Sequence, residues 1–200
     1  MLDSITEEKL LKKAGRGDET AFMLLYERHR DGIRRFVYRF LGSTELAEEI
    51  THDCFLSMVQ KPSRFDPKRA SLRTYLFAAA RNLALKHIRQ AGNEILVYEL
   101  PESAYHTDQI DRYEPLRNLL DRELTTKVQE AMAELAPLQR EALILFECEE
   151  LTLAEIATIT GADIGTIKGR LHRARVRLRR LLAPYLKSDS SIITVEAYRQ

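Results

Sequence analysis

Residues 153–180 read LAEIATITGADIGTIKGRLHRARVRLRR, a pattern that predicts two helices joined by a tight turn. Thr152 stands three residues before Glu155, which is the spacing of a capping box at the start of the first helix. Gly161 can supply the positive φ that a sharp turn requires, and Asp163 can cap the second helix. Together these signals are typical of a helix-turn-helix.

The second helix of this pair is strongly basic. Between Lys168 and Arg180 it carries seven Lys or Arg residues and no acid. Its predicted apolar side consists of Ile164, Ile167, Leu171 and Leu178. A basic helix behind such a turn fits the groove of a polyanion, which favours DNA binding. A solvated basic face is the simpler alternative, so the role of the helix depends on the rest of the chain.

The overall composition describes a soluble globular protein. With 200 residues, 44% of them hydrophobic and 30% charged, the chain can form one domain or two small ones. No apolar run approaches the roughly 20 residues of a membrane-spanning helix, and the N-terminus lacks a signal-peptide pattern. We therefore expect a cytoplasmic protein with no membrane insertion, in which Cys54 and Cys148 are buried free thiols.

Charge is segregated along the chain although the net charge is only +1. Residues 45–60 carry four acids and no Lys or Arg. Residues 61–90 carry eight Lys or Arg against Asp66 alone, and residues 93–114 are acidic again. Such segregation indicates separate faces for separate partners.

Helical periodicity dominates the N-terminal half. The first helix is expected to start at a Ser4–Glu7 capping box, and the second to run from Asp18 to Gly42. A third should start at Ser43 and stop before Pro62, and a fourth should cover about residues 72–90. The fourth helix is expected to bury Leu72, Tyr75, Leu76, Ala79 and Leu83, and to expose Arg73, Phe77, Arg81, Lys86 and Arg89.

The predicted fold class is all-α with two small helical domains. We place an N-terminal four-helix bundle at residues 1–91 and an acidic linker at 92–122. A helix-turn-helix domain follows at 123–187 and a tail at 188–200. A strand over residues 192–195 is conceivable in the tail but is not predicted.

Catalytic chemistry has little support in the sequence. His52 and Cys54 lie two residues apart, which points them to different faces of a helix and argues against a metal pair. There is no Gly-rich phosphate loop and no nucleophile in a recognisable setting. We therefore expect no enzyme activity, no metal and no cofactor.

Three stretches resemble one known family. Residues 135–182, LAPLQREALILFECEELTLAEIATITGADIGTIKGRLHRARVRLRRLL, resemble the promoter-binding fourth region of sigma factors. Residues 21–60, AFMLLYERHRDGIRRFVYRFLGSTELAEEITHDCFLSMVQ, and residues 70–90, ASLRTYLFAAARNLALKHIRQ, resemble their second region. The order and spacing are those of the family, and there is no room for the extra domains of the large housekeeping forms. The chain thus resembles an extracytoplasmic-function (ECF) sigma factor.

This resemblance implies a partner for the acidic third helix. In the family, the corresponding helix docks on the clamp coiled coil of core RNA polymerase. Acids there would pair with basic residues of the partner and repel DNA. The implied core-binding residues are Glu45, Leu46, Glu48, Glu49, Ile50, Asp53 and Phe55, with the apolar members joining the surface or supporting it from beneath.

The resemblance also implies that the loop and the fourth helix melt the minus-ten element. Capturing unstacked bases requires aromatic or planar faces, and single-strand phosphates require Lys and Arg. The candidates are Arg64, Phe65, Lys68, Arg69, Arg73, Tyr75, Phe77, Arg81, Asn82 and Lys86. Tyr75 is equally well explained as a core aromatic.

The recognition helix is implied to enter the major groove of the minus-thirty-five element. Its candidates are Thr166, Lys168, Gly169, Arg170, His172, Arg173 and Arg177, of which Lys168, Arg170 and Arg173 are the first choices for guanine. The family often has Trp at Tyr75, an acid at Lys86, Gln near His52 and Ser at Gly169. Because of these differences, the promoter sequences recognised by other family members cannot be assigned to this chain.

We therefore interpret the chain as an alternative sigma factor that binds core RNA polymerase and promoter DNA. The resemblance also implies an anti-sigma factor as its regulator. Two other readings remain. One is a stand-alone helix-turn-helix regulator, which would bind duplex DNA without polymerase. The other is a sigma-like decoy or adaptor, which would bind polymerase without initiating.

Overall fold

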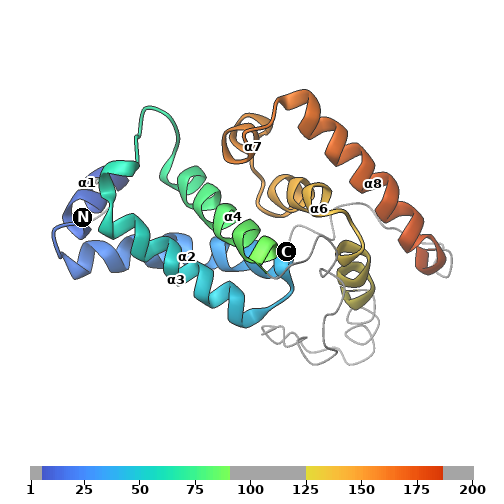
Figure 1. The fold of residues 1–200 in the computed structure, drawn as a ribbon, viewed down its shortest axis with the longest axis horizontal. Helices are drawn as coiled ribbons and strands as arrows, with labels where there is room; N and C mark the ends of the chain where they lie inside the picture. Colours follow the sequence, from blue (N-terminus) through green and yellow to red (C-terminus); the bar gives the residue numbers. More distant parts are fainter. Residues whose placement is uncertain (1–5, 91–124, 187–200) are drawn as a thin grey trace.

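The computed structural model describes residues 6–90 and 125–186, and Figure 1 draws both parts. Every regular element in these residues is helical, and they form the two domains of the predicted all-α fold. The predicted linker, the tail, the Ser4 cap and the conceivable strand at 192–195 lie outside the described residues. None of the helices in the described ranges combines the length and the apolar character needed to cross a membrane.

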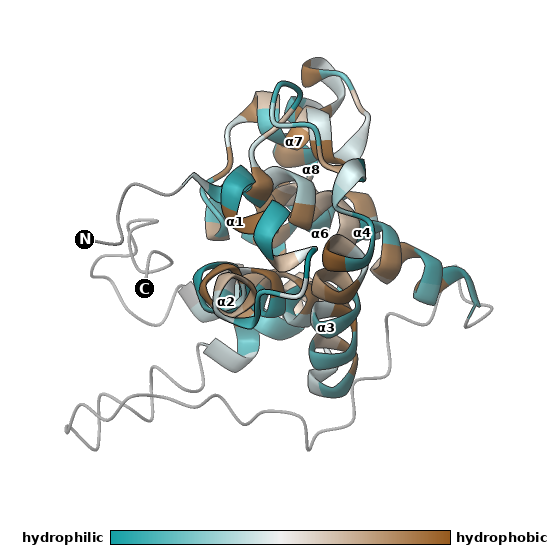
Figure 2. Cartoon of the chain, turned by 90° about the vertical axis from the view of Figure 1, so that its left-hand side faces the viewer, coloured by the Kyte–Doolittle hydropathy of each residue, from teal (hydrophilic) through white to brown (hydrophobic). Residues whose placement is uncertain are grey.

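The N-terminal half consists of α1 (Glu7–Ala14), α2 (Glu19–Leu41), α3 (Thr44–Gln60) and α4 (Leu72–Gln90). A single 3-10 turn, η1 (Pro62–Arg64), separates α3 from the loop that leads to α4. Helix α2 packs on α1, α3 and α4, which makes it the centre of the bundle. In Figure 2, both α2 and α3 have a hydrophobic and a hydrophilic side.

Local capping chemistry sets the boundaries of α2 and α3, as the sequence predicted. Helix α1 differs: its N-cap is Thr6, without a side-chain hydrogen bond, and not the predicted Ser4 of a Ser4–Glu7 box. The Asp18 carboxylate accepts a hydrogen bond from the Ala21 amide (3.0 Å), and Gly42 ends α2 in the left-handed region at φ 75°. Ser43 accepts from the Leu46 amide (3.2 Å) at the start of α3. Each cap satisfies a backbone group that the helix itself leaves unpaired.

The C-terminal half begins with a helical stretch over residues 125–133. It continues with α6 (Pro137–Leu143), which runs directly into a π-helical turn, η2 (Ile144–Cys148). The helix-turn-helix follows as α7 (Leu153–Thr160) and α8 (Ile164–Leu186). Helix α8 packs along α6 and also contacts α7, so that α6 and α7 together support it.

The helix-turn-helix has the local geometry that the sequence predicted. Thr152 and Glu155 form both bonds of the capping box, and Gly161 occupies the left-handed region at φ 69°. Asp163 accepts from the Thr166 amide at 2.8 Å, which caps α8. On the apolar side of α8, Ile167 is buried as expected, but Ile164 at the helix start is exposed.

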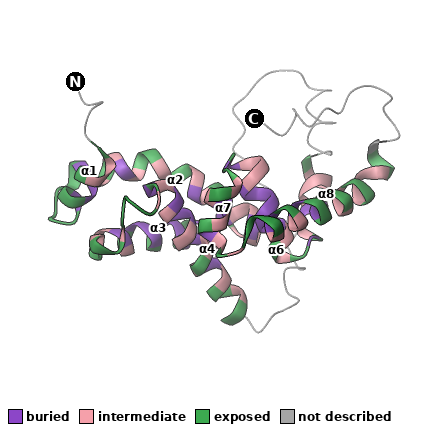
Figure 3. Cartoon of the chain, turned by 90° about the horizontal axis from the view of Figure 1, so that it is seen from above, coloured by how far each residue is buried: buried purple, intermediate pink, exposed green. Residues whose placement is uncertain are grey.

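The two halves pack against each other, which the sequence did not predict. Helix α4 lies along α7, and α2 contacts η2 and α6. Figure 1 shows this seam between the two groups of helices, and in Figure 3 buried residues continue across it. One cluster of buried side chains extends from Leu10 in α1 to Ala174 in α8.

This packing corrects the predicted orientation of α4. Phe77, expected on the exposed side, is only 1% exposed, and its ring meets that of Phe36 edge-on at 5.5 Å. Tyr75, expected on the buried side, is half-buried. Phe77 is buried against α2, and α7 of the second domain packs on α4 as well, so α4 has more covered surface than its own periodicity indicates.

Candidate nucleic-acid and partner surfaces

The outward side of α3 is an acidic surface. Glu45, Glu48, Glu49 and Asp53 are all exposed, as the sequence predicted. Within the described residues, Glu48 pairs with Arg34 through Oε1 and Nη1 at 3.5 Å, which is a long contact. Most of the negative charge of this side is therefore available to a partner.

The apolar members predicted for this surface have different positions. Ile50 and Phe55 are buried, and the Phe55 ring packs edge-on against Tyr26 at 4.9 Å. Leu46 is half-buried. These residues support α3 from within the bundle and leave the outward surface to polar groups.

Leu56 is an exposed apolar residue that sequence reasoning missed. It is 45% exposed and follows Asp53 by three residues and Glu49 by seven, which places it on the acidic side of α3. The helical spacing from the acids was the signal that could have identified it. A partner that docks on the acidic side of α3 would cover this apolar side chain and remove it from water.

The loop before α4 presents a second, basic surface. Arg64, Lys68 and Arg69 are exposed. Beside them, the rings of Phe65 and Tyr75 meet edge-on at 5.7 Å and 65°. Burial raises the pKa of Tyr75, against the opposing charge of Arg64. This combination of cations and a half-buried aromatic pair is suited to phosphates and unstacked bases.

The candidates on α4 fall into two groups. Asn82 and Lys86 are exposed, as expected. Arg73 and Arg81 instead reach the second domain. Arg73 Nη2 donates to the backbone oxygen of Glu149 at 2.5 Å, and the Arg73 guanidinium lies 5.4 Å from the centre of the Phe77 ring.

Arg81 is held more firmly than Arg73. Its Nε donates to Glu141 Oε1 at 2.5 Å and its Nη2 to Oε2 at 3.5 Å. The Glu141 side chain is completely buried, and that of Arg81 is 13% exposed. In this conformation, therefore, neither arginine is available to DNA in the way that Asn82 and Lys86 are.

The third surface lies at the start of α8. Lys168, His172 and Arg173 are exposed there, whereas Arg170 is half-buried. At Gly169, an added Cβ would lie 3.4 Å from Arg173 Nη1, so the absence of a side chain leaves room for that arginine.

Other predicted cations and polar groups of α8 already have partners. The Thr166 hydroxyl donates to the Asp163 carboxylate at 2.6 Å as part of the helix cap. Further along, Arg177 pairs with Glu134 at 3.0 Å, and Arg175 pairs with Glu147. The exposed basic residues of α8 outside these pairs are thus Lys168, His172 and Arg173 in its first three turns, and Arg179 and Arg180 further along.

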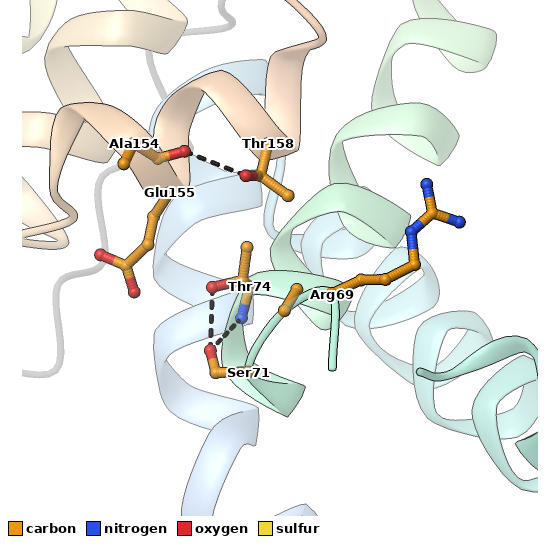
Figure 4. Close-up of a pocket in the computed structure, with 7 residues that line it drawn as sticks. Arg69, Ser71, Thr74, Ala154, Glu155 and Thr158 are labelled. Atoms are coloured by element: carbon orange, nitrogen blue, oxygen red, sulfur yellow. Dashed lines mark hydrogen bonds between the residues drawn. The ribbon is translucent and has the colours of Figure 1, made fainter. Parts of the chain in front are cut away.

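A small cavity of about 170 Å³ lies between the start of α4 and α7 (Figure 4). Its hydroxyls are bonded locally: Ser71 Oγ and Thr74 Oγ1 lie 2.8 Å apart, and Thr158 donates to the Ala154 oxygen at 3.0 Å. The remaining labelled lining residues are Arg69 and Glu155. No group of three potential metal ligands occurs in residues 6–90 or 125–186.

Burial suppresses the reactivity of both cysteines. It raises the pKa of Cys54 to about 12 and also raises the pKa of Cys148. Both are free thiols; Cys54 is buried as predicted, and Cys148 is only partly buried.

Comparisons with known proteins identify the family of this chain. The family "Sigma-70 region 2" matches residues 25–94, and the family "Sigma-70, region 4" matches residues 125–178. An all-α protein that carries these two regions in this order is a sigma factor. Sigma factors are regulatory proteins that bind core RNA polymerase and promoter DNA.

The relatives define the group within the family. The chain is 29% identical to the ECF RNA polymerase sigma factor SigW of Bacillus subtilis over 183 residues, covering 88% of this chain and 96% of that protein. It is 28% identical to the ECF sigma factor BldN of Streptomyces coelicolor, covering 90% and 67%. The chain belongs to the ECF sigma factors of the sigma-70 family, which are alternative sigma factors that direct transcription.

A solved structure has the same arrangement of helices. The sigma factor RpoE of Bartonella quintana, crystallised in complex with the anti-sigma factor NepR, superimposes with a TM-score of 0.64 at 26% identity. The match covers 81% of this chain and 96% of that chain.

Proposed function

We propose that this chain carries the three contacts of promoter-specific initiation on three separate surfaces. The acidic side of α3, with Leu56, binds core RNA polymerase. The loop at residues 64–69 and the exposed part of α4 capture the melted minus-ten strand. The start of α8 reads the minus-thirty-five element in the major groove.

The observation that carries this proposal is the separation of charge. The α3 surface is acidic and exposed, whereas the loop surface and the start of α8 are basic. A chain that only bound duplex DNA would have no need of an exposed acidic helix next to a basic, aromatic loop. The order of these surfaces along the chain is also that of the two matched family regions.

Promoter melting requires no catalytic group in this scheme. The free energy comes from binding unstacked bases and single-strand phosphates more strongly than duplex DNA. Phe65 and Tyr75 supply a ring pair for bases, while Arg64, Lys68 and Arg69 supply charge. Asn82 supplies an amide that can read a base edge.

We propose the domain limits 1–91 and 123–187, with the linker at 92–122 and the tail at 188–200, and a cytoplasmic location. An anti-sigma factor is the proposed regulator. Its support is the similarity to the RpoE chain that was solved with NepR bound.

The test is run-off transcription with purified core polymerase over a library of promoter fragments. We expect the chain to form a stable complex with core polymerase. We also expect transcripts from a small subset of the fragments, and only when the chain is present. Core binding without transcripts from any fragment would favour a decoy or adaptor. Specific duplex binding without core binding would favour a stand-alone regulator.

A further inference from the structure

The basic loop that precedes α4 is held together by its own hydrogen bonds. The Phe65 amide donates to the Pro62 oxygen at 3.2 Å, which closes the 3-10 turn η1. The Asp66 backbone oxygen then accepts from the Arg69 amide at 3.0 Å, and the Asp66 carboxylate accepts from the Lys68 amide at 3.0 Å. These bonds make the loop one unit, so a displacement of Pro62 is transmitted to Phe65 and to the cations that follow it.

Helix α1 meets this loop at a crowded point at one end of the bundle (Figure 1). A Cβ added at Gly15, directly after α1, would lie 2.9 Å from Pro62 Cγ and 3.4 Å from Pro62 Cβ. Carbon atoms that are not bonded to each other prefer a separation of about 3.5–4.0 Å, so 2.9 Å is a clash. The ring of Pro62 is rigid and cannot turn away from a new methyl group. The missing side chain of Gly15 therefore allows the loop to lie where it does.

The backbone conformation of Gly15 does not itself require a glycine. Its φ and ψ are −66° and −9°, in the right-handed helical region that any L-residue adopts. Gly17, two residues later, differs, because its φ is 92° and no atom lies within 4 Å of an added Cβ. The two glycines thus have separate roles: Gly17 permits the turn of the backbone, and Gly15 permits the close approach of Pro62.

Helix α1 is firmly attached to the bundle. Its residues Leu10, Leu11 and Ala14 are buried, and the helix packs along α2. At its start, Glu7 Oε1 lies 2.8 Å from His29 Nε2 of α2. The end of α1 is therefore a fixed support, and a clash there would move the exposed loop sooner than the helix.

Beside the crowded contact, α1 and the loop are separated by a cavity of about 260 Å³. Leu11 from α1 and Phe65 from the loop are among the residues that line it. Groups that face each other across empty space gain no dispersion energy and do not fix the loop. The position of the loop therefore depends on the contacts at its edges, which are Pro62 against α1 and the ring of Phe65 against that of Tyr75.

We infer that Gly15 is a positioning residue of the minus-ten surface: through its contact with Pro62, α1 sets where the loop presents Phe65 and its cations to the melted strand. The inference rests on the proposed function, because it takes the loop to be the part that captures unstacked bases. A surface that is already held in its binding arrangement loses less conformational entropy on binding. Helix α1 contributes in this way to strand capture without itself contacting DNA.

The test measures the effect of Gly15→Ala in two backgrounds, the natural chain and Pro62→Ala. The Pro62→Ala change removes the Cγ that the added Cβ would meet at 2.9 Å and leaves the Cβ at 3.4 Å. Gly17→Ala is the matched control, because it strains the backbone of the same turn without meeting any atom. The readout is the fluorescence anisotropy of a labelled pool of random-sequence single-stranded DNA, titrated with each full-length protein.

Gly15→Ala is expected to weaken single-strand affinity about fivefold in the natural chain and to have no effect in the Pro62→Ala background, because residues in contact are coupled. Its midpoint of chemical denaturation should stay at the wild-type value or rise, since alanine suits this backbone and restricts the unfolded chain. Gly17→Ala should show the reverse, a lower midpoint with wild-type affinity.

Three results would overturn the positioning role of Gly15. The first is an unchanged affinity of Gly15→Ala in the natural chain, and the second is an equal loss of affinity in both backgrounds. The third is a loss of affinity in Gly17→Ala as large as that in Gly15→Ala, which would mean that affinity follows the stability of the turn.

Run-off transcription separates this inference from the proposed function. Transcripts from the wild-type protein, together with equal effects of Gly15→Ala in both backgrounds, would remove the positioning role and leave the sigma activity. A loss of single-strand affinity that depends on Pro62, with no wild-type transcript from any promoter, would remove the proposed function and leave the positioning role.

Discussion

Reversing the charge of Glu48 and Glu49 should separate polymerase binding from folding and from DNA binding. Both carboxylates are exposed on α3, and Arg34 Nη1 approaches Glu48 only to 3.5 Å. The Glu48→Lys/Glu49→Lys double variant therefore loses little within the molecule. We expect its midpoint of chemical denaturation to stay close to that of the wild type.

The effect on core binding can be worked out from the charges. An exposed ion pair contributes about 0.5 kcal/mol, and reversal replaces that attraction by a repulsion of similar size, so each residue costs about 1 kcal/mol. Two residues together cost about 2 kcal/mol, which raises the Kd for core polymerase about 30-fold. The effect should shrink as salt concentration rises, because exposed charges are screened.

The assay is fluorescence anisotropy with labelled protein and increasing core polymerase. The matched control is Glu130→Lys/Glu150→Lys, which makes the same change in net charge at exposed positions of the second domain. Affinity of each protein for a duplex promoter fragment is measured in parallel. Equal loss of core binding in both double variants, or loss of duplex affinity only in the α3 variant, would refute the assignment of the acidic surface.

The remaining predictions concern the recognition helix, its turn and one histidine. Arg173→Ala should weaken binding to the preferred duplex by about 1–3 kcal/mol and relax the sequence preference. Arg179→Ala should weaken binding to all duplex sequences equally. Measuring the affinity of each variant for a set of base-substituted duplexes checks both. Gly161→Ala should lower the free energy of unfolding by about 1–2 kcal/mol, because φ is 69° and an alanine is strained in this left-handed conformation. No atom lies within 4 Å of the added Cβ, so the backbone conformation alone sets this cost, and Gly161→Asn should lower the free energy of unfolding less. Burial lowers the pKa of His29 more than nearby Glu7 raises it, so the unfolded chain binds more protons just below pH 6.5. The free energy of unfolding should therefore fall as pH falls through 6.5, and His29→Gln should reduce that slope in denaturant titrations.

Local signals predicted much of this fold. Asp18, Ser43, Asp163 and the Thr152–Glu155 box cap the helices that the sequence assigned to them. Such caps depend on backbone groups within three residues, so the sequence alone specifies them. The all-α, two-domain class and the family followed from these helices and from their spacing.

The errors arose where distant residues decide the outcome. Phe77 is buried against α2, and α7 of the second domain packs on α4 as well, which no pattern within α4 indicates. Glu141 is a charged residue with no exposed surface, which only its partner Arg81, sixty residues away, makes tolerable. The periodicity of a helix sequence indicates which of its faces is apolar. It does not indicate that a second element covers the other face.

The same limit affected the candidate sites. Sequence reasoning identified the acidic residues of α3 and the basic loop, because charge and exposure go together there. It placed Arg73 and Arg81 with the free cations, although the second domain holds both. It also missed Leu56, because an apolar residue on a helix is ordinarily assigned to the core.

Permanganate mapping of unpaired thymines tests the central claim most directly. A promoter fragment that the chain activates in run-off assays is probed with core polymerase alone, with the chain alone and with both. The prediction is a block of reactive thymines upstream of the start site only when both are present, and its loss when Arg64, Lys68 and Arg69 are all changed to Ala. Reactive thymines with core alone, or full opening by the triple variant, would contradict the account.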